Sequence, residues 1–265
     1  MPTRRALCGW LAASTAATGL NGLAPARATA SALAGVAASA QAAGGFRIAP
    51  KSRWVLIGDS ITDTGRARPI GEAPGGLGDG YVRQIDAFVN AWYPAHRVRL
   101  FNTGTSGHTI RDLAERWQTD VIDLQPDWLS VMIGANDVWR QFDRPAQPER
   151  HVLPAEHERT YDQLLTRTRP MLKGGLILIT PFLLELRTDD PMRARMDEYG
   201  AIVKRLATKH DAVLVDSQAA FNTVLEDLPS QAINGDRVHL NHIGAAVLAR
   251  AVLSAVGFGW TGSNA

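Results

Sequence analysis

The sequence is short of cysteine and, over its first fifth, of acidic residues. Its 265 residues contain one cysteine, Cys8, and no aspartate or glutamate precedes Asp59. A single cysteine excludes a disulfide-stapled scaffold and a structural zinc site built on cysteine ligands. With 45% hydrophobic and 20% charged residues, the chain otherwise has the composition of a globular protein, and it is long enough to bury a sizeable core.

Residues 1–43 carry the excess positive charge. They contain 16 alanines, three arginines and no acid. The whole chain has a formal net charge of +2, whereas the chain without these three arginines has 25 basic and 26 acidic residues and a net charge of −1. A surface so close to neutral argues against a nucleic-acid-binding protein, which needs a clustered basic face.

The same segment has the pattern of an export signal. Arg4 and Arg5 precede a mildly apolar run over 6–23, and small residues follow, with cleavage candidates at 24–26, 28–30 and 38–40. The stretch TRRAL at 3–7 is similar to the twin-arginine export motif, and an ordinary secretory signal is the alternative. We predict that 1–43 is a cleaved signal and linker, and that the protein is exported, to the periplasm or beyond.

Export has two consequences for the mature protein. Cys8 leaves with the signal, so no thiol nucleophile remains. Polar residues interrupt the apolar run, and no other stretch reaches the length of a membrane span, so we expect no membrane span after cleavage.

Apolar runs alternate with helical patterns after residue 46. Short, continuously apolar runs predict strands at 54–57, 98–101, 128–133, 176–179 and 213–215. Helical spacing predicts helices at 82–92, 110–124, 157–172, 192–209 and 243–256. This alternation indicates an α/β fold with a parallel sheet covered on both faces. We expect one domain over 46–265.

Polar residues follow the predicted strands, where sites form in open parallel sheets. Ser60 is a candidate nucleophile, His239 a candidate base, and Asp236, three residues before it, a candidate orienting acid. The order Ser, Asp, His along the chain is one of the known triad orders. Each residue alone is as well explained as a helix cap, a turn residue or a surface histidine, but all of these segments should converge on one edge of the sheet.

An oxyanion needs hydrogen-bond donors at the same edge. The backbone N–H groups of Ser60 and Gly104 and the side-chain amide of Asn136 would supply three. Ser106, in the loop after the second strand, lacks the second glycine of a G-x-S-x-G turn, so we interpret it as a loop residue.

These segments resemble the four blocks of the SGNH (GDSL-type) esterase family. The blocks are Gly58-Asp59-Ser60-Ile61, Gly104, Gly134-Ala135-Asn136-Asp137 and Asp236-Arg237-Val238-His239. The resemblance implies a three-layer α/β/α sandwich with a central five-stranded parallel sheet of flavodoxin-like type. It also implies a Ser60–His239–Asp236 triad, an oxyanion hole from Ser60, Gly104 and Asn136, and neither metal nor cofactor.

Longer stretches are similar to the bacterial acetylxylan esterase branch of that family. They are 57–69, 131–141 and 190–193, and the resemblance spans about 53–260. It implies hydrolysis of acetyl esters on xylan or xylo-oligosaccharides. Two positions depart from the branch, which usually carries tryptophan and proline where this chain has Gly235 and Leu240. Both positions bear on the sugar-contacting wall and not on the triad.

Four further residues are candidates for substrate contact. They are Asp59, Trp139, Arg140 and Trp260. Trp139 could stack on a sugar or pack in the core, Trp260 could line the site or pack on the domain, and Arg140 could hold substrate or pair with an acid. A homo-oligomer is left open.

Other functions compete with this interpretation. A lipid esterase, arylesterase or thioesterase would use the same blocks, and a carbohydrate-binding protein could retain them without activity. The glycine-rich run 75–80 could suggest dinucleotide binding, but it does not follow a strand directly. His239, His242 and Asp236 could suggest a metal site, but zinc histidines at this spacing usually lie on a helix with other ligands.

Overall fold

The computed structural model describes residues 45–260, and the predicted signal at 1–43 lies outside them. The described chain forms a six-stranded sheet in the order β2-β3-β1-β4-β5-β6. The strands are β1 (Arg53–Gly58), β2 (Gly71–Glu72), β3 (Arg99–Asn102), β4 (Trp128–Met132), β5 (Gly175–Ile179) and β6 (Val213–Val215). The five predicted parallel strands are confirmed, and the short β2, which sequence patterning missed, adds an antiparallel edge beside β3.

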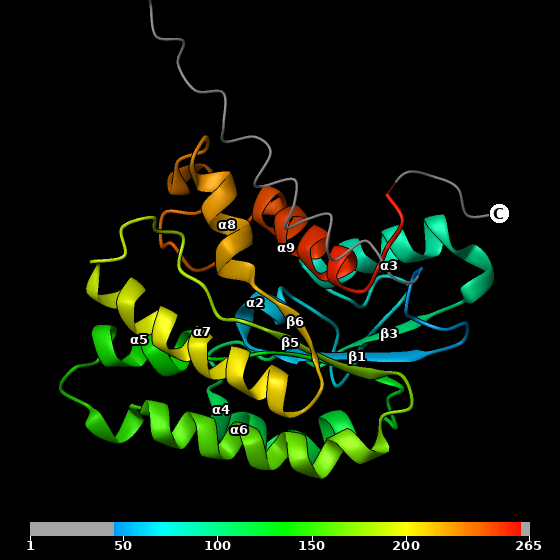
Figure 1. Cartoon of the computed structure of the whole chain (residues 1–265), viewed down its shortest axis with the longest axis horizontal. Coiled ribbons are helices and arrows are strands. Elements are labelled where there is room, and N and C mark those ends of the chain that lie inside the picture. Colours follow the sequence, from blue (N-terminus) through cyan, green and yellow to red (C-terminus); the bar gives the residue numbers. More distant parts are fainter. Residues whose placement is uncertain (1–44, 261–265) are drawn as a thin grey trace, which may run out of the picture. The chain divides into compact units, whose positions relative to one another are not determined.

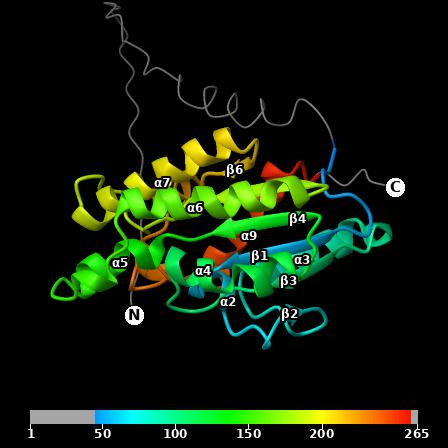
Figure 2. The same cartoon turned by 90° about the horizontal axis from the view of Figure 1, so that it is seen from below.

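Helices cover both faces of the sheet (Figure 1). They are α2 (Ser60–Asp63), α3 (Tyr81–Trp92), α4 (Ile110–Trp117), α5 (Ala135–Asp143), α6 (Pro154–Thr168), α7 (Pro191–Lys209), α8 (Ser217–Leu225) and α9 (His242–Ala255). In Figure 1, α3, α8 and α9 lie above the sheet, and α4, α6 and α7 lie below it. The view from below, in Figure 2, shows α4 and α6 across the lower face. The expected three-layer sandwich is confirmed.

The strands are apolar on both sides because each face has its own core. Trp54 and Leu56 of β1 belong to the hydrophobic cluster under α3 and α9, whereas Val55 and Ile57 belong to the cluster under α4 and α6. All four side chains are fully buried. This is why no polar alternation marks the strands in the sequence.

Sequence patterning placed the long helices well and missed three short ones. The helix expected at 110–124 is α4 followed by a π-helical turn at Gln118–Ile122, and the helix expected at 157–172 is α6, with Pro154 in its first turn. Helix α2, with four residues, and helices α5 and α8, with nine residues each, were not predicted. Helix α5 starts directly after Gly134, so the rest of the block at 134–137 is helical.

The strand order fixes where a site can form. The chain passes from β1 to β3 on one side and then crosses to β4 on the other, so β1 lies between them. This is the flavodoxin-like order, with the β1/β4 pair at its topological switch point. Ser60 follows β1 and Asn136 follows β4, so both lie at the carboxyl ends of the strands that flank this point. Within residues 45–260, no helix has the length and apolar character needed to cross a membrane.

The end of β1 tolerates no side chain. A Cβ atom at Gly58 would overlap the carbonyl oxygen of Met132 in β4 and the Oγ1 atom of Thr62 in α2. We predict that Gly58→Ala lowers the free energy of unfolding by about 1–3 kcal/mol, the usual cost of overpacking. Urea denaturation should show this, with Gly45→Ala as the control because its Cβ would meet no atom within 4 Å. Equal stability of the two variants would contradict the prediction.

Candidate active site

The predicted nucleophile, base and acid form a continuous chain of hydrogen bonds. Ser60 Oγ lies 2.9 Å from Nε2 of His239, and Nδ1 of His239 lies 2.6 Å from Oδ2 of Asp236. A neutral histidine with its proton on Nδ1 satisfies both contacts, because it donates to the carboxylate and accepts from the hydroxyl. The geometry therefore suits transfer of the Ser60 proton to Nε2.

The loop that carries the acid and the base is stabilised by hydrogen bonds within it and by ion pairs to a neighbouring segment. Oδ1 of Asp236 accepts the backbone N–H groups of Val238 and His239, each at 2.9 Å. The side chain of Arg237 points the other way and forms ion pairs of 3.0 Å with Glu185 and Asp190. Contacts within this one loop therefore fix Asp236 and His239 relative to each other, independently of the rest of the site.

These contacts keep Asp236 ionised. Burial by itself raises the pKa of the Asp236 carboxyl, but the hydrogen bonds from the His239 side chain and from the backbone outweigh it, so the pKa lies below its ordinary value. An ionised carboxylate is what an orienting acid requires, because it holds the histidine tautomer and stabilises the imidazolium that forms when Ser60 is deprotonated.

Ser60 is the first residue of α2, and Asp59 caps that helix. Oδ1 of Asp59 accepts the N–H of Ile61 at 3.0 Å, so Asp59, and not Ser60, is the N-cap residue of α2. Ser60 is the first helical residue, so its N–H group has no hydrogen-bond acceptor within α2. That N–H is therefore available to a ligand at the helix N-terminus.

Two of the three expected oxyanion donors already have partners in this structure. The Gly104 N–H donates to Oδ1 of Asn102 at 2.9 Å, and the Asn136 amide donates to the carbonyl of His108 at 3.0 Å. Nδ2 of Asn136 has a second hydrogen for another acceptor. Its orientation is set because Oδ1 accepts Nη2 of Arg140 at 3.2 Å.

Gly104 occupies a position where no other residue fits. A Cβ atom there would lie 2.5 Å from the backbone nitrogen of Asp63 and 2.7 Å from the carbonyl carbon of Thr62. The loop after β3 is therefore packed backbone to backbone against α2, directly behind the predicted nucleophile. Ser106, in the same loop, donates its hydroxyl to Asp63 at 2.8 Å and makes no hydrogen bond to a histidine of residues 45–260.

The four expected substrate residues have different fates. Trp139 lies beside the triad, with its ring centroid 5.7 Å from that of His239. Arg140 pairs with Asp143 and contacts Asn136. Asp59 and Trp260 do not lie where a direct contact with substrate was expected. Asp59 is buried, with 1% of its surface exposed. Trp260 bonds to Ser254 near the far end of α9 from His239 and packs on Phe88 and Phe258.

Sequence reasoning missed several polar groups beneath the site. Asp137 and His157 are fully buried, with Oδ1 of Asp137 2.9 Å from Nδ1 of His157, and the Asp137 carboxylate also accepts the N–H of Ile110. Arg116 donates to the carbonyl of Gly58 at 2.8 Å. Its signal in the sequence was its place at the edge of the apolar face of helix 110–124, next to Trp117.

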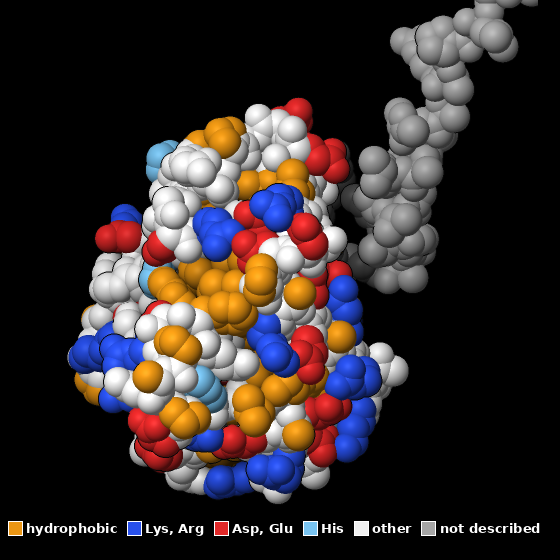
Figure 3. All heavy atoms as spheres, turned by 90° about the vertical axis from the view of Figure 1, so that its left-hand side faces the viewer, with side chains coloured by type: hydrophobic (Ala, Val, Ile, Leu, Met, Phe, Trp, Pro, Cys, Tyr) orange, Lys and Arg blue, Asp and Glu red, His pale blue; other side chains and the backbone are white. Residues whose placement is uncertain are grey.

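The carboxyl edge of the sheet faces the viewer in Figure 3. Hydrophobic side chains gather near the middle of this face, and charged side chains of both signs surround them. Trp139, half-buried next to His239, belongs to this edge. An apolar centre with a mixed-charge rim suits an uncharged substrate.

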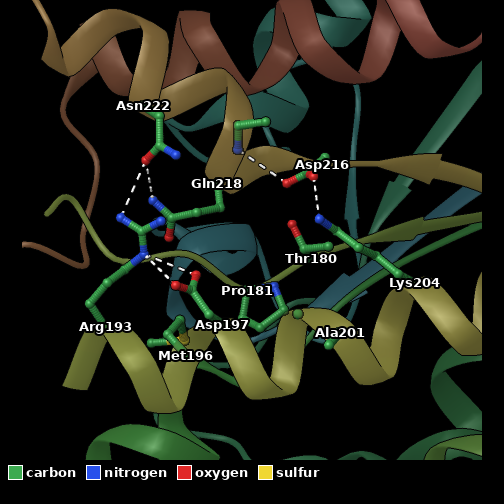
Figure 4. A pocket seen from close by; sticks show the side chains of 12 residues that line it. Thr180, Pro181, Arg193, Met196, Asp197, Ala201, Lys204, Asp216, Gln218 and Asn222 are labelled. Atoms are coloured by element: carbon green, nitrogen blue, oxygen red, sulfur yellow. Dashed lines mark hydrogen bonds and ion pairs between the residues drawn. The ribbon is translucent and has the colours of Figure 1, made fainter. Parts of the chain in front are cut away.

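A separate cavity of about 210 Å³ lies between α7 and α8 (Figure 4). Its charged groups are satisfied among themselves: Arg193 pairs with Asp197 at 2.9 Å, and Lys204 pairs with Asp216 at 2.5 Å. It contains none of the predicted site residues. Across residues 45–260, no group of three or more His, Cys, Asp or Glu side chains is arranged to hold a metal ion.

The sheet order, and the contact between Ser60, His239 and Asp236 at its carboxyl edge, match the SGNH type of hydrolase. The model of the GDSL-like lipase/acylhydrolase family matches residues 56–247. The chain belongs to this family and is a carboxylic ester hydrolase.

Individual relatives cover most of the chain. An acetylxylan esterase from Geobacillus stearothermophilus is 49% identical over 220 residues, which are 83% of this chain and 100% of that protein. The crystal structure of Axe2, an acetylxylan esterase from the same organism, matches with a TM-score of 0.81 at 48% identity, over 82% of this chain and 100% of that one.

A third relative is LAE5, an alpha/beta hydrolase enzyme from the metagenome of Lake Arreo, Spain. It matches with a TM-score of 0.78 at 48% identity, over 80% of this chain and 98% of that one. Both resemblances inferred from the sequence blocks, to the family and to its acetylxylan esterases, are confirmed by these matches.

The buried carboxyl of Asp59 gives a prediction about pH. Burial, reinforced by the charge of Asp137, raises the pKa of Asp59 from 3.8 to about 7. Between these values the folded protein retains a proton that the unfolded chain has released. Stability should therefore fall as the pH rises across this window, by up to about 1.4 kcal/mol per pH unit.

Asp59→Asn should remove that loss, because the amide oxygen can still cap Ile61 and carries no charge. We expect the stability of the variant relative to wild type to increase steadily from pH 4 to pH 7 and to level off above it. Urea denaturation of both proteins at each pH measures the difference. Parallel stability curves for the two proteins would contradict a raised pKa at Asp59.

Proposed function

We propose that this protein is an exported serine esterase that removes O-acetyl groups from xylan or xylo-oligosaccharides. The observation that carries the proposal is the hydrogen-bond chain from Ser60 through His239 to Asp236 at the carboxyl edge of the sheet. Its 49% identity to an acetylxylan esterase supports the substrate class. Residues 1–43, with Arg4 and Arg5 before an apolar run, support export through the twin-arginine route.

The proposed reaction has two halves. Oγ of Ser60 attacks the acetyl carbonyl carbon while Nε2 of His239 takes the hydroxyl proton, and the carbonyl oxygen becomes an oxyanion. Collapse of this intermediate breaks the bond to the sugar oxygen, which leaves with the proton from His239, and acetyl-Ser60 remains. Water then attacks acetyl-Ser60 with His239 again as the base, and acetate and free Ser60 result.

The oxyanion requires donors that already point at it. The free N–H of Ser60, the second Nδ2 hydrogen of Asn136 and the N–H of Gly104 are the proposed donors. For Gly104 this means that its N–H is shared between Asn102 and the oxyanion, or released by Asn102, when the intermediate forms. Trp139, beside His239, would form one wall against the sugar or the acetyl group.

Acetate release from acetylated xylo-oligosaccharides tests the function. Ser60→Ala should reduce it by at least about 10⁴-fold, because the variant lacks the proposed nucleophile. Ser106→Ala, a serine in the neighbouring loop that donates to Asp63, should retain activity. Wild-type rates for Ser60→Ala would overturn the mechanism.

The length of the acyl chain distinguishes this proposal from other esterases of the same fold. The same assay with acetyl, butyryl and octanoyl esters should show a steep fall beyond acetyl. A preference for octanoyl esters would indicate a lipid esterase instead. A folded protein that binds xylan but releases no acetate would indicate a binding protein without activity.

Asn136 is the proposed oxyanion donor that substitution can test most directly, because it donates through its side chain and the other two donate through the backbone. We predict that Asn136→Ala lowers kcat by about 10²–10³-fold, as expected for the loss of one oxyanion donor. The KM for acetylated xylo-oligosaccharides should change far less, since the donor acts in the transition state. Asn90→Ala, which removes an amide that bonds to Asp86 on α3, is the control. An unchanged kcat for Asn136→Ala would remove Asn136 from the mechanism.

A further inference from the structure

Two adjacent residues of α5 both bond to the segment that leads into α4. The Asn136 amide donates to the carbonyl of His108 at 3.0 Å, and the carboxylate of Asp137 accepts the N–H of Ile110 at 3.3 Å. Ile110 is the first residue of α4, so these bonds join the N-terminal ends of α4 and α5. The contact that places the Asn136 amide is therefore reinforced by the next residue of the same helix.

His157 of α6 supports Asp137 from a third element. Nδ1 of His157 lies 2.9 Å from Oδ1 of Asp137, and both side chains are fully buried. The His157 ring packs against Tyr161 and Tyr199, with ring centroids 5.6 Å and 4.9 Å away. A Cβ atom at Gly134 would lie 3.5 Å from Cε1 of His157, so the ring also lies close to the residue before α5. The position of His157 is thus fixed on several sides.

The start of α5 has little restraint of its own. Its N-cap residue, Gly134, makes no side-chain capping bond, and its φ of 125° lies in the region that favours glycine. The direction of the first turn of α5 therefore depends on tertiary contacts. Asn136 lies in that turn, and an oxyanion donor must point accurately at the developing charge. The bonds from Asp137 to Ile110 and His157 supply the missing restraint.

The proposed reaction uses neither Asp137 nor His157. Replacement of such a buried polar pair by apolar residues of similar volume is often neutral or stabilising, so filling space is a poor explanation for it. Nε2 of His157 has no hydrogen-bond partner within residues 45–260, so the ring makes one directed contact, to Asp137. A hydrogen bond defines a direction that apolar packing does not, and this suits a role in fixing geometry.

We propose that Asp137 and His157 are a buried positioning pair that holds the first turn of α5, and with it the Asn136 amide, in place for the oxyanion. Neither residue contacts a reacting atom. This inference rests on the proposed serine esterase function. Because the pair acts through a donor used in the transition state, its loss should affect kcat and not KM.

Three variants separate the hydrogen bond from the packing. His157→Leu removes the donor to Asp137 and still fills much of the space, and it leaves the Asp137 carboxylate in place. His157→Asn keeps a donor, because Nδ2 of asparagine is as many bonds from Cα as Nδ1 of histidine. Asp137→Asn keeps the shape of the acid and removes its charge.

Thr168→Val is the matched control. The Thr168 hydroxyl is buried and accepts Nε1 of Trp117 at 2.8 Å, so this bond also joins α4 to α6, but at the C-terminal end of α4. The measurements are kcat and KM for acetate release, thermal stability, and the Kd of methylboronic acid. When this acid binds, Oγ of Ser60 bonds to boron and its proton passes to His239, which gives a tetrahedral boronate that mimics the intermediate.

For His157→Leu we expect kcat to fall by about 10–10²-fold, the cost of a donor displaced by about an ångström, while KM changes by less than about twofold. The Kd of methylboronic acid should rise by a similar factor. His157→Asn should recover most of this loss, although it fills the space less well than leucine. Thr168→Val should lose thermal stability but keep the kcat and boronic acid affinity of wild type. Equal losses of kcat at His157 and Thr168 would indicate a purely structural role and overturn the inference.

A double variant tests whether the pair acts through Asn136. In Asn136→Ala the amide is already absent, so adding His157→Leu should lower kcat by less than about twofold more, instead of tenfold or more. If the two losses multiply instead, the pair does not act through Asn136 and the inference is wrong.

Failure of a variant to fold also decides. If His157→Leu does not fold, Asp137→Asn replaces it in both comparisons, with kcat expected to fall by about threefold to tenfold because a neutral amide oxygen is a weaker acceptor than a carboxylate. If neither folds, the pair is structural and the inference fails.

Ser60→Ala in the same assay tests the proposed function separately. If this variant retains activity, the esterase mechanism itself fails. An inactive Ser60→Ala beside an unaffected His157→Leu disproves only the positioning role.

Discussion

The position of β1 between β3 and β4 is the constraint on which the rest of the site depends. Because β1 pairs with both neighbours in parallel, its carboxyl end is the one place where segments from both halves of the sheet meet. A Cβ atom at Gly58 would overlap Met132 and Thr62, so only glycine fits at the end of β1, and α2 starts two residues later. Ser60 is thereby presented at the switch point without a long loop.

Polar groups are buried directly beneath this point, at a cost that the surrounding contacts offset only in part. Asp59, Asp137 and His157 are nearly or fully inaccessible. Asp137 is compensated by the Ile110 N–H and by His157, whereas Asp59 has one backbone N–H and a raised pKa. His157 Nε2 has no hydrogen-bond partner among the described residues, which a neutral ring with its proton on Nδ1 tolerates because only a lone pair is left over. Such burial is typical of sites that favour fixed geometry over stability.

The sequence predicts those parts of the structure that depend on local pattern. The parallel strands and long helices follow from apolar periodicity, and the contact between Ser60 and His239 follows from four short blocks and the rule about strand ends. Helix α5 was missed because its first residues, Ala135 and Asn136, are also the site block. Arg116 and Asn102 were missed because their contacts cannot be read from the sequence pattern. Arg116 reaches carbonyls at the end of β1 and in the loop after β3, and the amide oxygen of Asn102 accepts the Gly104 N–H.

The two halves of the proposed machinery differ in how much of the fold they need. Asp236 and His239 are three residues apart, and their geometry is set within one turn by the Asp236 contacts with Val238 and His239. The oxyanion donors come instead from α2, the loop after β3 and α5, which no local turn can align. Tertiary packing between these segments is therefore needed to align the oxyanion donors, but not to align Asp236 and His239. Changes in the packing of these segments should consequently affect the oxyanion hole more than the acid–base pair.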